Sequence, residues 1–320
     1  MSNRRAEGES TGSFRRYEFV QLDVFASRPL EGNPLAVFTD ARGLSDQEMQ
    51  ALAREMMLSE TTFILPREIA TERQQGVKAR IFTVNEELPF AGHPTLGTAF
   101  TLHGTDRRAR PEDHTIRVRS HENVIQLDLK VGKIPVAFEE GQGGLMFGEM
   151  RQRDPSFGAV HSPEEVSRAT GLKLDDLDPS APIQTVSTGL EFTLVPLRAL
   201  ETLQNLRVSW QQMAGYLERT QARFFYFVCR GGVDPAARLH ARMIFYNGED
   251  PATGSAAGCA AAWAVRHGVL KPDQRSLIEQ GVEIHRPSQI FVRASREGDR
   301  VSNVRVGGYA VEVLRGEVVL

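Results

Sequence analysis

The sequence predicts a mixed α/β (α+β) protein of two duplicated domains, each with a sheet wrapped around one central helix. Its 320 residues are enough for two domains. The heptapeptide HPTLGTA at 93–99 returns as DPATGSA at 250–256, 157 residues further on (residue 250 against residue 93). The segments before the two copies, RIFTVNEE and RMIFYNGED, also match. An internal duplication explains these matches better than chance.

Strands and helices follow one another in the order expected for such a domain. Alternating apolar and polar residues predict strands at YEFVQLDVFA, LAVFTD, ETTFILP and VKARIFTVN, and again at FFYFVCR and ARLHARMIFYN. Ser45 and Glu48 form a capping-box pattern, which predicts a helix at 45–58. A peripheral helix within 162–178 is expected to be its counterpart in the second half.

The expected domain boundaries follow the repeat. Residues 1–16 are polar and predict a disordered tail. Residues 17–131, together with about 308–320, are expected to form the N-terminal domain, and 132–307 the C-terminal domain. The glycine-rich segment 141–150 is interpreted as a hairpin or linker near the boundary, because a dinucleotide fingerprint would need a third glycine and a following helix.

Composition excludes several classes of protein. A formal net charge of −3 argues against a nucleic-acid partner. No apolar run reaches the roughly 20 residues of a membrane span, and the N-terminus lacks the apolar core of a signal peptide. The two cysteines form no CxxC pattern, which favours a reducing, cytoplasmic location. No P-loop, histidine metal motif or lysine at a repeated helix start is present, so we expect no cofactor and no metal.

Both repeated helices are expected to be buried, because TGSAAGCAAAWAV offers no polar face. A buried helix start presents unpaired N–H groups and the positive end of the helix dipole, and glycines let a ligand approach that backbone. Two such starts facing one cleft would receive a carboxylate or a developing enolate-like charge. Small residues in these helices could also serve only for tight packing against the sheet. Two matched copies that differ in their ionisable residue favour a ligand site instead.

Several segments resemble the phenazine-biosynthesis isomerase family, the PhzF-like proteins of the diaminopimelate-epimerase fold. They are DVFASRPLEGNPLAVF, AREMMLSETTF, PFAGHPTLGTA, EDPATGSAAG and QGVEIHRPS, and the resemblance runs from about Tyr17 to the C-terminus. It implies two similar domains around a central cleft, each a mixed, largely antiparallel, barrel-like sheet around one helix. It also implies a homodimer that acts on a small carboxylate substrate like trans-2,3-dihydro-3-hydroxyanthranilate.

The resemblance also implies a set of site residues. Glu60 matches the glutamate of the family's SET motif, the general acid/base, although a glutamate between a helix and a strand is more often a solvated end. His93 and Asp250 match residues that line the pocket, and the aspartate approaches the substrate's amino group. Gly92, Gly254 and Ser255 match groups that hold the substrate, with Gly254 and Ser255 at its carboxylate.

Simpler interpretations of two of these residues stay open. His93 could be a hydrogen-bonding residue of a helix start, where the dipole would keep it neutral. Asp250 could be an N-cap. Thiol racemases of this fold place a cysteine at each helix start, and here Cys259 lies about a turn and a half inside the second helix. A cofactor-independent isomerase is therefore expected, with a racemase or epimerase of the same fold, or a non-catalytic binding protein, as alternatives.

Overall fold

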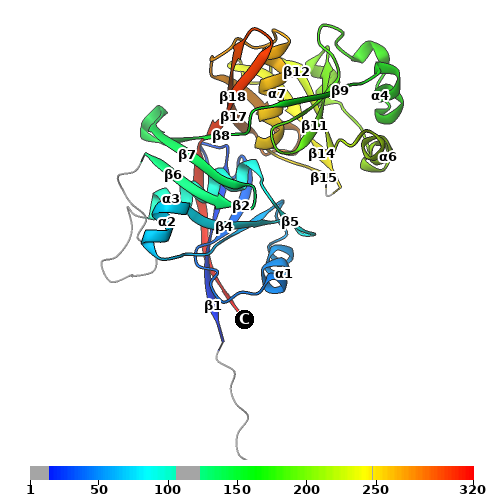
Figure 1. Ribbon diagram of the computed structural model, residues 1–320. Helices are drawn as coiled ribbons and strands as arrows, with labels where there is room; N and C mark the ends of the chain where they lie inside the picture. The colour runs from blue at the N-terminus through cyan, green and yellow to red at the C-terminus, as the bar shows by residue number, and fades with distance from the viewer. Residues whose placement is uncertain (1–13, 106–122, 247) are drawn as a thin grey trace, which may run out of the picture.

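The computed structural model describes residues 14–105, 123–246 and 248–320, which form a mixed α/β fold of two lobes (Figure 1). The first lobe, mostly blue to cyan in the figure with β7 in green and the last strand in red, holds the helices α1 (Asp46–Met56), α2 (Ile69–Gln75) and α3 (Gly92–Thr105). Its strands are β1 (Arg16–Val24), β2 (Asn33–Phe38), β3 (Thr61–Ile64), β4 (Val77–Phe82), β5 (Glu87–Leu88), β6 (Val124–Leu129), β7 (Gly132–Glu140) and the last strand of the chain, β19 (Ala310–Val319).

The second lobe, green to orange, holds α4 (Pro163–Thr170), α5 (Leu200–Gln204), α6 (Trp210–Thr220) and α7 (Gly254–Arg266). Its strands are β8 (Met146–Arg151), β9 (Ser156–Val160), β10 (Gln184–Ser187), β11 (Glu191–Leu197), β12 (Phe224–Arg230), β13 (Ala237–Arg242), β14 (Ile244–Phe245), β15 (Gly248–Glu249), β16 (Ser276–Gln280), β17 (Ser288–Glu297) and β18 (Arg300–Gly308). Short 3₁₀ turns are η1 (Gln142–Gly144), η2 (Leu174–Asp176) and η3 (Val282–Ile284).

One 17-stranded sheet runs through both lobes and repeats its own pairing order. Along the first half of the sheet, which ends at β8, β1–β2 is antiparallel, β2–β3 parallel, β3–β4 antiparallel, β4–β6 parallel, and β6–β7 and β7–β8 antiparallel. The second lobe gives the same order for β10–β11, β11–β12, β12–β13, β13–β16, β16–β17 and β17–β18. The antiparallel pair β8–β18 joins the two halves. This repetition supports the predicted duplication.

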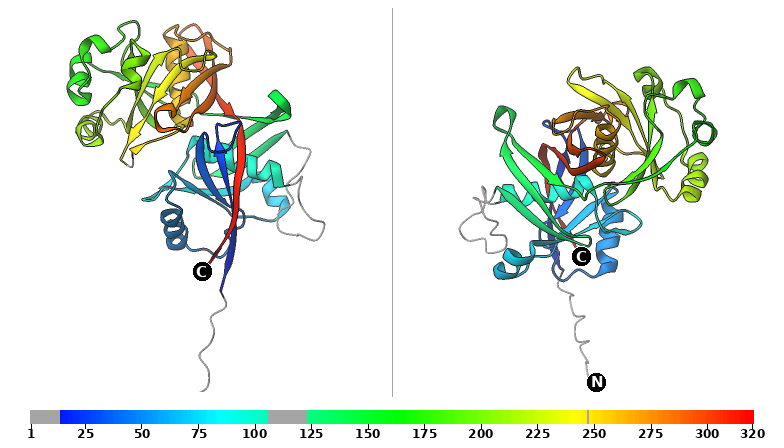
Figure 2. Two further views of the ribbon diagram at one scale, coloured as in Figure 1. Left: turned by 180° about the vertical axis from the view of Figure 1, so that it is seen from behind. Right: turned by 45° about the horizontal axis from the view of Figure 1, so that its top comes forward.

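Each half of the sheet wraps around one buried helix. The central helix of the first half, α3, contacts β1, β2, β6 and β8. The central helix of the second half, α7, contacts β10, β11, β17 and β18. Every residue of α7 from Gly254 to Val265 is buried, as its lack of a polar face predicts. Leu96, Ala99 and Leu102 of α3 are buried as well. In Figure 2, β19 (red) runs beside β1 (blue), so the C-terminal strand returns to the first lobe.

Local predictions fare differently. The capping box at Ser45 and Glu48 is confirmed, and 141–150 lies in the β7–β8 hairpin. The expected match of 162–178 with 45–58 is wrong: α4 precedes β10, the counterpart of β1, whereas α5 and α6 take the place of α1 between a parallel strand pair.

The domain boundaries stay predictions. The expected boundary after residue 131 falls in the tight turn between the paired strands β6 and β7. Most of the expected tail, residues 1–13, lies outside the described residues, and β1 begins at Arg16. No helix in the described part of the chain is long and apolar enough to cross a membrane.

Candidate active site

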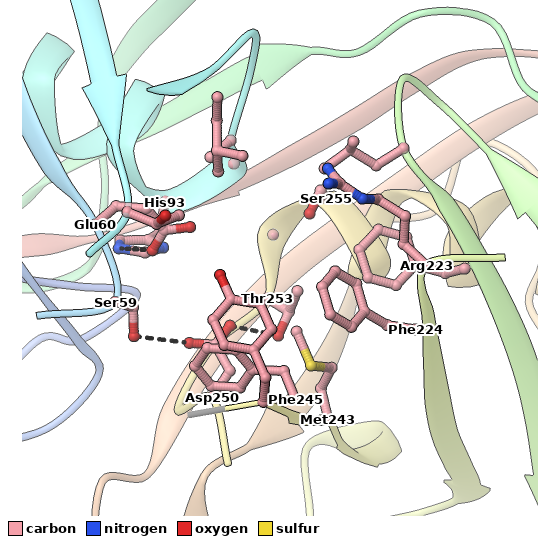
Figure 3. Close-up of a pocket in the computed structure, with 18 of the residues that line it drawn as sticks. Ser59, Glu60, His93, Arg223, Phe224, Met243, Phe245, Asp250, Thr253 and Ser255 are labelled. Atoms are coloured by element: carbon pink, nitrogen blue, oxygen red, sulfur yellow. Dashed lines mark hydrogen bonds and ion pairs between the residues drawn. The ribbon is translucent and has the colours of Figure 1, made fainter. Parts of the chain in front are cut away.

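A pocket of about 640 Å³, counted out to its open mouth, lies between the two lobes (Figure 3). Side chains from both lobes line it. The structure brings together all six residues that the sequence singles out, which are Glu60, Gly92, His93, Asp250, Gly254 and Ser255. Their shared position supports a single site; their individual roles stay proposals.

The two central helices begin against each other at this pocket. A Cβ atom added at Gly92 would lie 2.6 Å from the backbone nitrogen of Ser255 and 2.8 Å from the Cα atom of Gly254. Among the residues that the structure describes, the backbone N–H groups of Gly92, Gly254 and Ser255 have no backbone or side-chain acceptor. Unpaired donors and the positive ends of two helices therefore face the pocket, an arrangement that favours a negatively charged group.

The two copies of the repeated heptapeptide differ in local structure. His93 lies in the first turn of α3, whereas Asp250 precedes α7 by a short loop. Gln280 explains the loop, since its side chain donates to the backbone oxygen of Asp250 (2.7 Å) and accepts the N–H of Thr253 (3.1 Å). These backbone groups are satisfied outside a helix, so α7 begins only at Gly254, after Asp250, whereas α3 begins at Gly92, before His93.

Glu60 lies between α1 and β3, with its side chain 16% exposed. Its Oε2 atom is buried without a hydrogen-bond partner and lies 3.5 Å from Nε2 of His93 (Figure 3). Burial raises the pKa of Glu60 well above its usual range, and the negative charge of Asp250 adds to that shift. A raised pKa favours the protonated form of this carboxyl group, which can then serve as a proton donor.

His93 is buried on α3, and its two ring nitrogens have different surroundings. Nδ1 lies 3.2 Å from the amide nitrogen of Asn33, and Nε2 is buried without a hydrogen-bond partner. Burial lowers the pKa of His93 to about 3, so the ring is neutral at physiological pH.

Asp250 is the most fully satisfied ionisable group of the pocket. Its carboxylate accepts hydrogen bonds from Thr253 (2.6 Å), Asn33 (2.8 Å) and Ser59 (3.4 Å). Burial raises the pKa of Asp250 to about 6, and these three bonds oppose that rise. Asp250 is therefore ionised at neutral pH, whereas Glu60, which has no such donors, holds the proton of the pair.

The sequence interpretation missed the rest of the pocket wall. Apolar and aromatic side chains of the second lobe line it, with an arginine at one side: Leu190, Phe192, Arg223, Phe224, Met243, Phe245 and Tyr246. The segments FFYFVCR and ARLHARMIFYN had been interpreted only as strands. Their aromatic content was a visible signal, but the face exposed to the cleft depends on the fold.

Two central helices that meet at one pocket, with two carboxyl groups buried in it, define an enzyme of the isomerase and epimerase class. The chain belongs to the phenazine biosynthesis-like protein family (PhzC-PhzF), whose family model matches residues 22–316. It is 36% identical over 308 residues to a trans-2,3-dihydro-3-hydroxyanthranilate isomerase of Pseudomonas chlororaphis, covering 95% of this chain and 100% of the relative. The chain is an isomerase of the PhzF type.

Solved structures agree on the fold. A Bacillus anthracis protein described as a phenazine biosynthesis protein of the PhzF family superposes with a TM-score of 0.82 at 26% identity, covering 96% of this chain and 100% of that one. A hydroxyproline epimerase of Agrobacterium vitis superposes with a TM-score of 0.64 at 11% identity, covering 96% of this chain and 93% of that one. The second likeness concerns the fold alone.

Proposed function

We propose that this enzyme moves a proton along a small ring amino acid with adjacent double bonds, such as trans-2,3-dihydro-3-hydroxyanthranilate. The observation that carries the proposal is the buried, unpaired carboxyl oxygen of Glu60, which faces His93 in a pocket that also holds Asp250. A buried acid without a hydrogen-bond partner, in a pocket with other ionisable groups, is a candidate for proton transfer. Phe192, Phe224 and Phe245 supply apolar wall area for a ring.

The unpaired N–H groups of Gly92, Gly254 and Ser255 would hold the substrate carboxylate. Asp250 would accept from the substrate ammonium group, and the neutral His93 would donate to a substrate oxygen. Burial is the main cause of the raised pKa of Glu60, and the charge of Asp250 adds to it. A positive ammonium group beside Asp250 would offset that second part and lower the pKa of Glu60 as the substrate binds. The binding step thus prepares the base.

Glu60 would then act as both base and acid. Its carboxylate removes a proton from one ring carbon, and the electron pair of that C–H bond becomes part of a shifted C=C bond. The protonated Glu60 exchanges with solvent, and the carbon at the far end of the system then takes a proton from it. One C–H bond breaks, another forms, and nothing is oxidised or reduced. The protein's task is to hold one carboxyl group within reach of both carbons.

Incubation of the dihydro-hydroxyanthranilate in D₂O tests the proposal. The wild type is expected to give a product with a shifted double bond and deuterium at the new C–H position. Glu60→Gln, a matched isostere, is expected to keep the fold and lose exchange by about 10²- to 10⁴-fold. Wild-type exchange rates in Glu60→Gln would remove Glu60 from the reaction.

The same incubation addresses the alternatives. Deuterium incorporated with inversion and no bond shift would mark a racemase or epimerase, a chemistry that the shared fold with the hydroxyproline epimerase keeps in view. Binding without exchange would mark a non-catalytic protein. Cys259 is buried in α7 beside Thr188 and does not line the pocket, so a racemase here would not use that thiol. Homodimeric assembly, a cytoplasmic location and independence of cofactors stay predictions.

A further inference from the structure

Asn33 joins the two sides of the site without lining the pocket. It begins β2 and is fully buried. Its amide nitrogen lies 2.8 Å from Oδ1 of Asp250, 2.9 Å from the backbone oxygen of Ala252 and 3.2 Å from Nδ1 of His93. One side chain of the first lobe therefore contacts the ionisable residue of each repeated segment.

The chemistry of an amide determines the proton on His93. A carboxylate and a carbonyl oxygen flank the Asn33 nitrogen, and both accept, so this atom is the NH₂ group rather than the oxygen. An NH₂ group only donates, so Nδ1 of His93, at 3.2 Å, carries no proton. The proton of the neutral ring is then on Nε2, which faces Oε2 of Glu60 at 3.5 Å.

The position of Asn33 is itself fixed from the other lobe. Arg286 donates to the backbone oxygens of Glu31 (2.8 Å) and Gly32 (2.9 Å), just before Asn33, and to the buried carboxylate of Asp23 (2.6 Å). The N–H of Gly32 donates to the backbone oxygen of Pro287. These hydrogen bonds hold the turn before Asn33 and so limit the positions that the Asn33 side-chain amide can take. Residues that position a catalytic group are usually held in this way.

We propose that Asn33 is a positioning residue for the reaction, holding His93 with its proton on Nε2 toward Glu60 and holding the Asp250 carboxylate toward the substrate. The inference deepens the proposed function and rests on it for its kinetic readout. The alternative is that Asn33 only stabilises the meeting of the lobes. A purely structural role would change stability and the active fraction, and would leave the His93 tautomer and the pH profile unchanged.

The test uses the full chain with ¹⁵N-labelled histidine. Two-bond ¹H–¹⁵N NMR spectra are expected to show His93 of the wild type protonated at Nε2 alone. In Asn33→Asp, an isostere, the new carboxylate accepts from Nδ1 and moves the proton there. We expect kcat to fall about 10- to 100-fold, the size of a lost hydrogen bond to a charged group. Because Asp250 loses a donor and gains a negative neighbour, the acidic limb of the kcat profile moves to higher pH.

Thr253→Val is the matched control, because Thr253 donates to Asp250 and not to His93. It is expected to move the acidic limb in the same direction and to leave the His93 tautomer unchanged. The other titratable groups around Asp250 are Glu60, His93, Tyr226 and Glu249, and both variants leave them in place. If Asn33→Asp does not fold, Asn33→Ser tests the link to Asp250, because its shorter side chain takes the donor away from Asp250 and should still move the acidic limb to higher pH.

Two results would overturn the inference. One is a wild-type His93 protonated at Nδ1; the NMR measurement needs no substrate and stands even if the proposed reaction is wrong. The other is an Asn33→Asp enzyme with the wild-type tautomer and an unchanged pH profile. A wild-type enzyme that shows the expected His93 tautomer but exchanges no deuterium into the substrate would contradict the proposed function. The positioning of His93 by Asn33 would still stand.

Discussion

Single atoms decide what the site can do. Two buried polar atoms, Oε2 of Glu60 and Nε2 of His93, have no hydrogen-bond partner and face each other at 3.5 Å. An unsatisfied buried polar group costs about 1–3 kcal/mol. Both residues line the pocket, so a polar group that enters the pocket could offer either atom the hydrogen bond that it lacks.

Gly92 is the residue at which the two helix starts are tightest, and its replacement is a sharp test. In Gly92→Ala the new Cβ would meet the backbone of Gly254 and Ser255, which cannot move as a side chain would. We expect a loss of about 1–3 kcal/mol in the free energy of unfolding. The helix starts should separate, so kcat/KM should also fall. Urea titration and steady-state kinetics measure the two effects.

Gly104→Ala is the control for that substitution. Gly104 lies near the other end of α3, and a Cβ added there meets no atom within 4 Å. The variant is expected to keep wild-type stability and activity. Equal losses in both variants would show that α3 tolerates no added methyl group, and would argue against a special contact at Gly92.

Sequence patterns predicted part of this chemistry and missed part of it. Glu60, His93 and Asp250 lie in short motifs that can be recognised along the chain. The internal repeat and the family resemblance were therefore enough to select them. Asn33 lies in one of the segments that carry the resemblance, but GNP is typical of a turn and nothing in the sequence marks its side chain as part of the site. Its amide acquires a role only when the start of β2 packs against residues 60 and 217 positions away. Contacts of that range belong to the fold.

Elements of the second lobe are joined by a buried charged cluster away from the pocket. His240 of β13 contacts Glu279 of β16 through Nδ1 (2.5 Å) and Glu283 of η3 through Nε2 (2.9 Å). Glu279 also accepts the N–H groups of Val233 and Asp234, in the turn after β12. The cluster thus ties a strand end, a 3₁₀ turn and a hairpin turn together.

The charge of His240 should make this cluster sensitive to alkali. Burial lowers the pKa of His240, but its two carboxylate partners outweigh burial and raise it to about 9. A folded-state pKa above the unfolded value near 6.5 means that the stabilisation is complete below about pH 6.5 and is lost as the pH rises through about 9. We expect the wild type to lose at most about 3 kcal/mol of unfolding free energy in this way.

Urea titrations between pH 6 and pH 10 measure that loss by comparison with His240→Gln. The variant should be less stable than the wild type near neutral pH, and the difference should shrink toward pH 10. His267→Gln is the control, because burial lowers the pKa of His267 and it does not titrate at alkaline pH. A constant difference between wild type and His240→Gln across the range would show that the histidine is neutral in the folded protein.

Prediction of elements from the sequence succeeded where periodicity was strong and failed where the partner was distant. The apolar pattern of α7 predicted a buried helix, and the capping box predicted the start of α1. The extent of the loop at 250–253 could not be predicted, because it depends on the side chain of Gln280, on β16, which satisfies the backbone groups there. The counterpart of α1 was assigned to α4 by similarity alone, whereas the pairing order of the strands assigns it to α5 and α6.

At the scale of the whole molecule, the contacts between the lobes differ in two places. We call the buried side near Asn33 the base of the pocket and the exposed side near Arg223 its rim. The base has many buried links, among them Arg286 to Asp23 and Asn33 to Asp250. The rim has an exposed ion pair, Arg223 to Glu86 at 3.2 Å, between the start of β12 and the turn before β5. Both of these residues also line the pocket. This asymmetry favours a motion that opens the rim while the base holds.

The rim pair can act as a latch or as a receptor for substrate, and a charge exchange separates the two. If it is a latch, Arg223→Glu or Glu86→Arg alone should speed binding and release of a substrate analogue by about 1.5- to 5-fold, the range of an exposed ion pair. The exchanged double variant should restore both rates, and high salt should weaken the wild-type latch. Stopped-flow binding at two salt concentrations gives the rates. If Arg223 instead receives the substrate's negative charge, the double variant will bind weakly although its ion pair is intact, because the arginine then projects from the wrong lobe.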